Sequence, residues 1–257
     1  MSEGKKEILL GDCLELMKDI PNGSIDMILC DLPYGTTACK WDTIIPFDKL
    51  WEQYERIIKT NGAIVLTASQ PFTSALIMSN PKLFKYEVIF KKNIPSNPLL
   101  AKKQILKYHE NICVFYKTQP TFNPETKKRA EGNFRKNAKA EYEQRGVFGN
   151  TKMTAGDGEK EWVFEGSVIE ITSRDRGLHP TQKPVELFEK MIRTFTNEND
   201  LVLDNTAGSG TTAIACLNTK RQFIVMEKER KYYDIILKRV ADFNKNFEQQ
   251  TLFGNEM

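Results

Sequence analysis

The sequence predicts an α/β fold built on a mostly parallel sheet, and three observations support that prediction. Short apolar runs alternate with amphipathic stretches along most of the 257 residues, as expected of strands joined by helices that cover both faces of a sheet. One apolar run leads into the glycine turn 208–210, and the strand ends of such sheets are where ligands bind. A basic stretch without apolar periodicity interrupts the alternation, which predicts an insert.

Seven segments have the composition of strands, because they are short, apolar and bounded by polar or glycine-containing turns. They lie at 7–10, 24–30, 62–68, 86–91, 112–117, 201–204 and 222–227. The runs at 86–91 and 112–117 have no good helix between them. We therefore expect these two runs to pair antiparallel at one edge of the sheet.

Helices are predicted between most of the strands. Residues 47–60 place apolar side chains at helical spacing, and the pattern stops at Asn61-Gly62. Pro71 and Pro184 lie where a proline opens the first turn of a helix. A last long helix is expected over 229–247.

Composition excludes several classes of protein. The five cysteines form no CxxC pair and there are two histidines, so a structural zinc site is not expected and reduced thiols in the cytoplasm fit best. No apolar run approaches the roughly 20 residues of a membrane span. The first ten residues lack a signal-peptide pattern. We therefore expect a cytoplasmic protein without a metal site.

The net charge of +3 conceals a basic middle. Residues 117–145 contain eight basic and four acidic residues, and 85–107 contain six lysines against one glutamate. A solvated loop is one interpretation. The other is a surface that lies on a phosphate backbone, and its candidate DNA contacts are Lys91, Lys92, Lys127, Lys128 and Arg129.

The turn at 208–210 has three interpretations. A phosphate-binding P-loop needs a lysine after the glycines, and Thr211-Thr212 stand there. A dinucleotide site prefers a third glycine, and position 213 is alanine. A nucleoside-type cofactor needs an acid about 20 residues on that holds a ribose diol. Glu227 ends the next apolar run at that spacing, although a plain surface acid is the alternative.

The stretch CDLPYG at 30–35 also follows an apolar run. Asp31 and the Leu32 carbonyl are two acceptors for a planar amino group, whose lone pair is otherwise delocalised into a ring. They would stabilise the positive charge that develops on the nitrogen during attack. Pro33 restricts the turn and Tyr34 is placed to stack on a base. Each residue also has a purely structural interpretation when it is taken alone. Asp31 would cap a turn, and Tyr34 would pack in the core.

These stretches together resemble the amino-group DNA methyltransferases that depend on S-adenosylmethionine. DLPY at 31–34 is similar to the catalytic motif Asp-Pro-Pro-Tyr, and DNTAGSGTT at 204–212 to the cofactor motif, where Asn205 and Thr206 depart from the commoner form. Because the family uses backbone groups there, we expect little functional loss from those departures. LHPTQKPVELFEKMI at 178–192 resembles the segment beside the methionine end of the cofactor, and HENICVFYK a late strand of the sheet.

The catalytic motif precedes the cofactor motif, the permuted order of the beta group. The resemblance implies a Rossmann-like methyltransferase fold: a mostly parallel seven-stranded sheet with an antiparallel edge strand and a basic insert. In that fold 201–204, 222–227, 7–10 and 24–30 are the first four strands, so both motifs meet at adjacent strand ends. The implied contacts of S-adenosylmethionine are Asp12, Asp31, Lys183, Asp204, Thr206, Ala207, Gly208, Ser209, Gly210, Thr211, Thr212 and Glu227.

Four parts of the chain follow from this assignment. Residues 1–117 are the catalytic part, 118–170 a candidate DNA target-recognition insert, 171–247 the cofactor-binding part of the same domain and 248–257 a flexible tail. In the tail, QQTLF at 249–253 is similar to the pentapeptide by which bacterial proteins bind the replication sliding clamp. Folding of Leu252 and Phe253 back onto the last helix is the alternative, and a homodimer stays open.

The resemblance implies methylation of double-stranded DNA at the N6 of an adenine that has left the duplex, as in restriction-modification. The catalytic residues are Asp31, Leu32, Pro33 and Tyr34, and Trp41 or Phe72 would wall the pocket. Cytosine N4 methylation is the close alternative, which Asp rather than Ser at position 31 disfavours. An RNA or protein-glutamine methyltransferase and a non-catalytic DNA-binding protein are more distant alternatives, because both motifs are intact.

Overall fold

The computed structural model describes residues 4–37, 39, 42–128, 141–144, 151–154, 162–171 and 182–253. The chain divides into two compact units, one formed by 1–123 with 167–257 and the other by 124–166. The first unit contains both motifs and is built on one large sheet. The predicted α/β class is confirmed.

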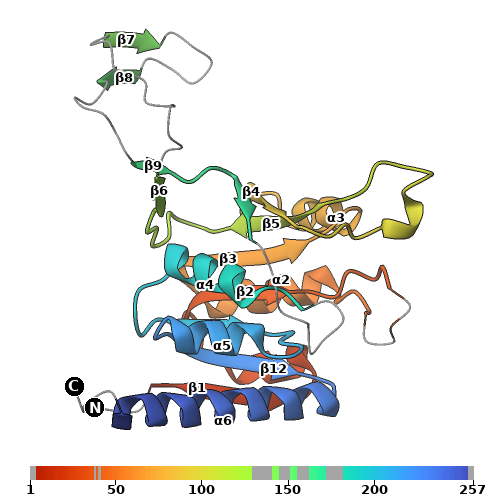
Figure 1. Cartoon of the computed structure of the whole chain (residues 1–257), viewed down its shortest axis with the longest axis vertical. Coiled ribbons are helices and arrows are strands. Elements are labelled where there is room, and N and C mark those ends of the chain that lie inside the picture. Colours follow the sequence, from red (N-terminus) through yellow and green to blue (C-terminus); the bar gives the residue numbers. More distant parts are fainter. Residues whose placement is uncertain are drawn as a thin grey trace. The chain divides into compact units, whose positions relative to one another are not determined.

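The sheet of the first unit has eight strands in the order β1-β12-β11-β2-β3-β5-β4-β10 (Figure 1). Every neighbouring pair runs parallel except those that involve β5. The strands span Lys6–Leu10 (β1), Ile25–Asp31 (β2), Ile58–Ala68 (β3), Phe84–Lys91 (β4), His109–Phe115 (β5), Val168–Glu170 (β10), Leu201–Asp204 (β11) and Gln222–Glu227 (β12).

Two features of this sheet differ from the sequence expectation. β4 and β5 do pair antiparallel, but β5 lies between β3 and β4 and not at the edge. The edge is β10, an eighth strand that sequence reasoning missed. It has three residues, of which only Ile169 is buried, and it follows a polar stretch, so no apolar run marks it.

Helices cover both faces of the sheet because side chains alternate along each strand. On β2, Met27 and Leu29 face a cluster that includes residues of α4 (Val185–Phe195), α5 (Thr211–Asn218) and α6 (Arg230–Phe253). Ile28 and Cys30 face the opposite cluster, which is covered by α1 (Cys13–Leu16), η1 (Met17–Asp19), α2 (Phe47–Ile57) and α3 (Phe72–Ser79). Both faces are thus buried, which explains why the central strands read as continuous apolar runs.

The two motif-bearing strands lie side by side. β2 and β11 are parallel neighbours, paired at Met27–Val202 and Ile28–Leu203. Asp31 is the last residue of β2 and Asp204 the last residue of β11. The prediction that motifs more than 170 positions apart meet at adjacent strand ends is therefore confirmed.

Two predicted helix ends were wrong. α2 ends at Ile57 and not at residue 60, and the chain enters β3 at once. Gly62 lies inside β3, where a Cβ would stand 2.8 Å from the Asp26 carbonyl oxygen. α6 continues to Phe253 and not to Phe247, so the backbone of 248–253 is helical where a flexible tail was expected.

Among the described helices, α6 included, none has the length and apolar composition of a bilayer span. The second unit contains two antiparallel pairs of strands. β6 (Thr126–Lys128) pairs with β9 (Trp162–Phe164), and β7 (Glu141–Gln144) pairs with β8 (Thr151–Thr154). This unit is narrower than the predicted insert 118–170, because Asn123 bonds to the end of α4 and β10 belongs to the large sheet.

Candidate active site

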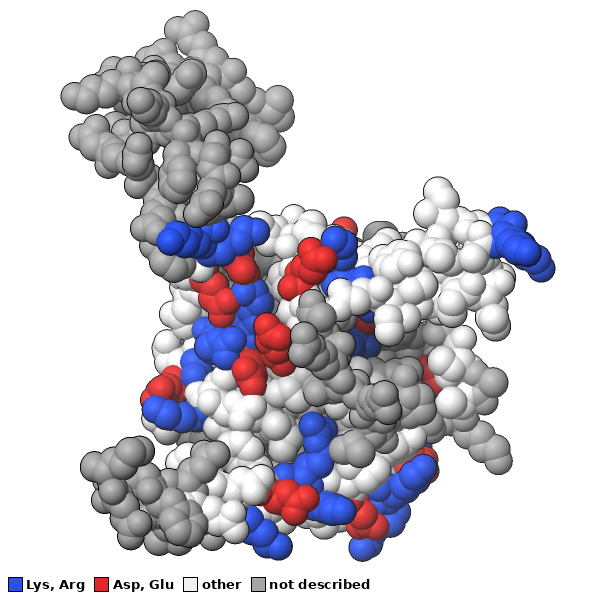
Figure 2. Space-filling model, in the orientation of Figure 1, with Lys and Arg blue, Asp and Glu red and all other residues white. Residues whose placement is uncertain are grey.

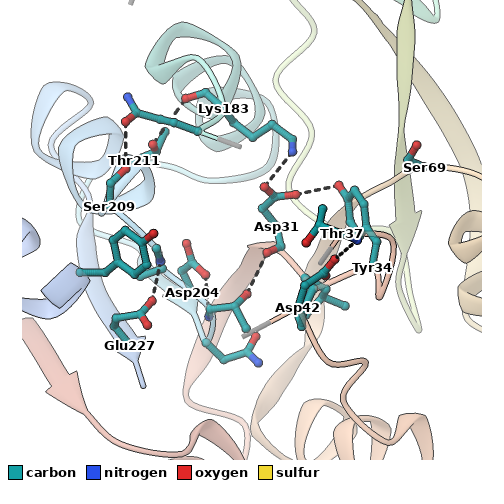
Figure 3. Close-up of a pocket in the computed structure, with 18 of the residues that line it drawn as sticks. Asp31, Tyr34, Thr37, Asp42, Ser69, Lys183, Asp204, Ser209, Thr211 and Glu227 are labelled. Carbon is teal, nitrogen blue, oxygen red and sulfur yellow. Dashed lines mark hydrogen bonds and ion pairs between the residues drawn. The ribbon is translucent and has the colours of Figure 1, made fainter. Parts of the chain in front are cut away.

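A pocket of about 890 Å³ opens where the carboxyl ends of the parallel strands meet. Its walls include both motifs and the loop after β4. In Figure 3, Lys183 and Tyr34 point toward Asp31, and Glu227 lies below the glycine turn. The four predicted catalytic residues and most of the predicted cofactor residues therefore share one pocket, whereas Gly210 and Thr212 do not line it.

Asp31 uses both carboxylate oxygens. Its Oδ1 accepts hydrogen bonds from the hydroxyl of Tyr34, at 2.7 Å, and from the hydroxyl of Thr67. Its Oδ2 accepts a hydrogen bond of 2.7 Å from the Nζ of Lys183. One oxygen thus faces two neutral hydroxyls, and the other faces a cation.

Lys183 belongs to a buried chain of alternating charge. Its Nζ lies 2.7 Å from Asp31 Oδ2 and 3.1 Å from Glu110 Oε2, while Glu110 Oε1 lies 2.7 Å from Lys92. Burial opposes the charge on Lys183, but Asp31 and Glu110 outweigh it and raise the pKa of Lys183 well above its usual value. Burial likewise opposes ionisation of Glu110, yet Lys183 and Lys92 lower the pKa of that carboxyl.

Tyr34 packs between the pocket and the core. Its ring stacks on Phe72 with centroids 5.1 Å apart, and its hydroxyl also lies 3.0 Å from Thr67 Oγ1. Burial and the nearby Asp31 raise the pKa of the Tyr34 hydroxyl well above 10, so it stays a neutral donor. Phe72 is buried behind Tyr34. Trp41, the other predicted wall, lies outside the described residues.

The loop after the catalytic motif is held by a residue that sequence reasoning missed. The buried carboxylate of Asp42 accepts hydrogen bonds of 2.8, 2.9 and 2.7 Å from the backbone N–H groups of Gly35, Thr36 and Thr37. Burial alone would raise the pKa of Asp42, but these donors together lower it. Asp42 therefore fixes the exit of the motif as a permanent anion.

The glycine turn of the cofactor motif satisfies most of its own backbone donors. The N–H groups of Thr206, Ala207, Gly208 and Gly210 bond to Asp204 Oδ1, Met226 O, Glu227 Oε2 and Ala207 O. A phosphate needs a ring of available N–H groups, which this turn does not present. A nucleoside cofactor without phosphate fits the turn better.

The two departures from the commoner cofactor motif connect the two motifs. The Oδ1 of Asn205 accepts hydrogen bonds from the hydroxyl of Tyr54, at 2.6 Å, and from the thiol of Cys30, at 2.8 Å. The hydroxyl of Thr206 lies 3.2 Å from the backbone carbonyl of Asp31, to which it donates. The side chains at both positions therefore connect β2 to β11. The expectation that only backbone groups matter at these positions did not include this role.

Asp204 accepts hydrogen bonds from residues on both sides of the glycine turn. Its Oδ1 accepts from the N–H of Thr206 at 3.0 Å, and its Oδ2 accepts from the hydroxyl of Thr212. Burial raises the pKa of Asp204 to about 7. Asp204 and Thr212, predicted as cofactor contacts, thus act on each other, although Asp204 also lines the pocket.

The remaining turn residues are tied to the segment before α4. Ser209 Oγ lies 3.0 Å from Gln182 Oε1, and Thr211 Oγ1 lies 3.4 Å from the Lys183 carbonyl. Lys183 is a predicted cofactor contact that lines the pocket, and its ammonium bonds to Asp31. Because residues 182–183 bond to the glycine turn, the side chain of Lys183 lies beside the Asp31 carboxylate.

The far end of the pocket contains the predicted ribose and adenine contacts. Glu227 accepts hydrogen bonds from the N–H groups of Gly208 at 2.8 Å and Glu229 at 2.7 Å, and burial raises its pKa. Asp12 caps α1 through the N–H of Leu14 at 2.9 Å. Both acids line the pocket, as does Tyr232 of α6, which sequence reasoning did not select.

The predicted DNA-contacting lysines divide into two groups. Lys91 pairs with Glu170 at 2.9 Å and Lys92 with Glu110, so neither projects as a lone surface cation. Lys127 and Lys128 are exposed on β6 of the second unit. Arg129 lies outside the described residues.

Comparison with known proteins agrees with this geometry. A family model described as DNA methylase, for the N6 and N4 enzymes, matches residues 25–238. Type II methyltransferase M.HinfI of Haemophilus influenzae is 29% identical over 93% of this chain and 69% of that protein. The DNA adenine methyltransferase YhdJ of Escherichia coli (strain K12) is 29% identical over 91% of this chain and 82% of that protein.

Solved structures share the fold. The complex of M1.HpyAVI with S-adenosylmethionine superposes with a TM-score of 0.61 at 25% identity, covering 91% of this chain and 98% of that one. The cytosine-N4-specific PvuII DNA methyltransferase gives a TM-score of 0.65 at 15% identity, covering 91% and 85%. At that identity the second likeness concerns the fold alone.

Proposed function

Because the chain belongs to the N6/N4 DNA methylase family, whose members transfer a methyl group from S-adenosylmethionine to an amino group of DNA, we propose that its acceptor is the N6 of adenine. The observation that supports this proposal is the placement of the DLPY motif. Asp31 ends β2 in the same pocket as the glycine turn that follows β11. Aspartate at the first motif position favours adenine, as does the similarity to the DNA adenine methyltransferase YhdJ.

The residues present fit the cofactor. The glycine turn has few available N–H donors for a phosphate, and the acids Glu227 and Asp12 lie at the far end of the pocket, where a ribose diol and an adenine amino group would donate. We assign this end to the nucleoside and the Ser209 end to the methionine part. When bound, S-adenosylmethionine supplies an electrophilic methyl group on a positively charged sulfur.

Asp31 and the Leu32 carbonyl are the acceptors for the target amine. Oδ1 of Asp31 is the side of the carboxylate that faces neutral hydroxyls, so an amine is able to replace the Tyr34 hydroxyl there. Tyr34 then retains its contact with Thr67, 3.0 Å away. The carboxylate stabilises the positive charge that develops on the nitrogen, and its fixed position removes the cost of reorganisation.

The depth of the site implies base flipping. The side chain of Asp31 is 22% exposed and that of Lys183 is 7% exposed, so a base stacked in a duplex does not reach them. An adenine that enters the pocket leaves its stack and its partner, which costs a few kcal/mol. Tyr34, at the pocket wall, is the residue we assign to stack on it. Such a substrate also favours a cytoplasmic location.

The first prediction tests this function. Asp31→Ala is expected to abolish methyl transfer because the amine loses its charged acceptor, while S-adenosylmethionine still binds. Isothermal titration calorimetry measures the binding, and a tritiated-methyl assay on unmodified DNA measures the transfer. Asp48→Asn, on the exposed face of α2, is the control. Turnover close to wild type in Asp31→Ala would sink the assignment.

The identity of the product separates adenine from cytosine. DNA methylated by the wild type, digested to nucleosides and analysed by mass spectrometry, is expected to contain N6-methyladenine and no N4-methylcytosine. N4-methylcytosine alone would establish the alternative acceptor and leave the fold and the cofactor site unchanged. Methylation-aware sequencing of the same DNA gives the recognition site. The sliding-clamp motif at 249–253 stays a prediction, for which a pull-down with the clamp is the test.

A further inference from the structure

The loop between β4 and β5, residues 92–107, is organised by its own backbone and polar side chains. The N–H of Lys92 bonds to Tyr108 O at 2.7 Å, and the N–H of Ser96 bonds to Lys107 O at 2.9 Å. Asn97 accepts from the N–H of Lys107 at 2.7 Å, and the one-turn helix η2 (Pro98–Leu100) follows. The loop therefore presents a defined tip and is not simply a slack connection.

The loop carries large apolar side chains that are exposed to water. Leu99 is 96% exposed, Ile105 is 95% exposed and Ile94 is 73% exposed. Single exposed apolar residues are ordinary, but several on one ordered loop indicate a surface that another molecule covers. In Figure 1 this loop projects from the sheet of the first unit beyond the ends of β4 and β5.

The surroundings of the tip identify the kind of molecule. Residues 92–107 include four lysines and no acid. Lys102 and Lys103, next to η2, are exposed, and Figure 2 shows basic side chains at the outer end of the loop. A membrane or a protein partner does not account for the next feature: Asn93, Ile94 and Ser96 line the same pocket as Asp31.

We propose that the loop 92–107 enters the DNA duplex beside the target base, with Leu99 and Ile105 as apolar wedges and Lys102 and Lys103 on phosphates. This inference rests on the proposed function. Proteins that insert apolar side chains between base steps offset the cost of unstacking the bases. The wedge fills the space that the departing base leaves and so favours its transfer into the pocket. The same loop thus contacts both the duplex and the flipped base.

The test compares two substrates for Leu99→Ser/Ile105→Ser. One is a matched duplex with the recognition site, and the other has the target base opposite an abasic position, where flipping costs less. The variant is expected to lose at least tenfold in kcat/KM on the matched duplex and to approach wild type on the abasic duplex. Met78→Ser, an apolar residue of α3 that is 71% exposed, is the control and should lose nothing on either substrate.

Each other outcome is decisive. Because the altered side chains are almost fully exposed, calorimetric binding of S-adenosylmethionine should equal that of the wild type. Equal activity of variant and wild type on the matched duplex, or an equal loss on both substrates, would overturn the wedge alone. A wild-type dimer that the substitutions convert to monomer in sedimentation velocity would assign the tip to a second copy. Failure of the wild type on both substrates would overturn the proposed function and the wedge together.

Discussion

Asp31 is held by two sets of partners that differ in charge, and the acid that maintains this difference is Glu110. Lys183 lies between the two carboxylates, 2.7 Å from Asp31 and 3.1 Å from Glu110. If Asp31 were the sole partner of Lys183, the ammonium would reduce the negative charge that Asp31 presents to the target amine. Glu110 shares the ammonium and so leaves Asp31 available as an acceptor. We regard Glu110 as a positioning residue that acts through Lys183.

Glu110→Gln is the second prediction. The amide keeps the shape of the side chain and an acceptor for Lys92, but it removes the negative charge, so Asp31 becomes the sole anionic partner of Lys183 among the described residues. We expect kcat to fall about tenfold, or roughly 1.4 kcal/mol in the barrier, with the KM for S-adenosylmethionine unchanged. Steady-state kinetics measures both constants. Glu87→Gln, whose carboxylate bonds to Asn111 at 2.8 Å on the neighbouring strand, is the control. A raised KM with unchanged kcat would assign Glu110 to cofactor binding instead.

Asp204 gives the third prediction, which concerns pH. Its pKa is about 7 in the folded protein and about 3.9 in an unfolded chain. A raised pKa means that the folded state binds the proton more tightly, so the stabilisation is complete below pH 4 and is lost as the pH rises through 7. Asp204→Asn mimics the protonated side chain and removes this dependence.

The free energy of unfolding of Asp204→Asn relative to wild type is expected to increase between pH 4 and 7. The slope approaches about 1.4 kcal/mol for each pH unit if one proton is involved. Urea unfolding at pH 5, 6, 7 and 8 measures it, with Asp48→Asn as the control. A difference that stays constant across this range would mean that Asp204 is ionised in the folded protein throughout.

At the scale of elements, the turn between β11 and α5 is fitted against α6. Gly210 has φ of +83° and is the N-cap of α5. A Cβ there would lie 3.0 Å from two carbons of Ile236, a fully buried residue of α6. The glycine is thus required twice, for its backbone conformation and for the close approach of a helix.

Gly210→Ala and Gly23→Ala separate these two requirements in the fourth prediction. Gly23 has φ of +59°, and a methyl group added to it would meet nothing within 4 Å, so its substitution costs only backbone strain, about 1–2 kcal/mol. Gly210→Ala adds a steric contact and is expected to cost about 1 kcal/mol more and to weaken the binding of S-adenosylmethionine. Denaturant unfolding and calorimetry measure the two effects. Equal costs would mean that α6 moves freely away from the turn.

At the scale of the whole molecule, the chain consists of a catalytic unit and a smaller unit with two antiparallel pairs of strands. The residues of the smaller unit, 124–166, fall within the stretch that was predicted to recognise DNA. Lys127 and Lys128 are exposed on its strand β6. We propose this unit as the target-recognition part, because β6 presents two exposed lysines and none of the described residues of the unit lines the pocket.

The fifth prediction is a salt dependence. Lys127→Ala/Lys128→Ala is expected to lower the affinity for duplex DNA and to flatten the log–log dependence of the binding constant on salt by up to about 0.9 for each phosphate that is no longer neutralised. Fluorescence anisotropy between about 50 and 300 mM salt measures the slope. Lys18→Ala/Lys49→Ala, two exposed lysines of the catalytic unit, is the charge-matched control. If both double variants shift the slope equally, the effect reflects net charge and not this unit.

The sequence by itself determined the α/β class, most strands and the two motifs. Each of these depends on local features: the apolar period along a strand, the glycines of a turn, and an acid that directly follows an apolar run. Even the meeting of motifs that lie more than 170 positions apart followed, because parallel strands of one sheet end at the same edge. Asp31, Gly208 and Glu227 were found in this way, and all line the pocket.

Only the tertiary structure decided what each polar side chain does. Glu110 and Thr67 lie on β5 and β3, and nothing in their local sequence indicates that Thr67 bonds to Asp31 or that Glu110 shares its lysine. Lys183 was predicted as a cofactor contact, and its ion pair with Asp31 was not foreseen. The physical reason is that the charge and the partners of a buried group depend on desolvation and on contacts between residues distant in sequence. Those contacts exist only once β2, β3, β5 and β11 are aligned in the sheet.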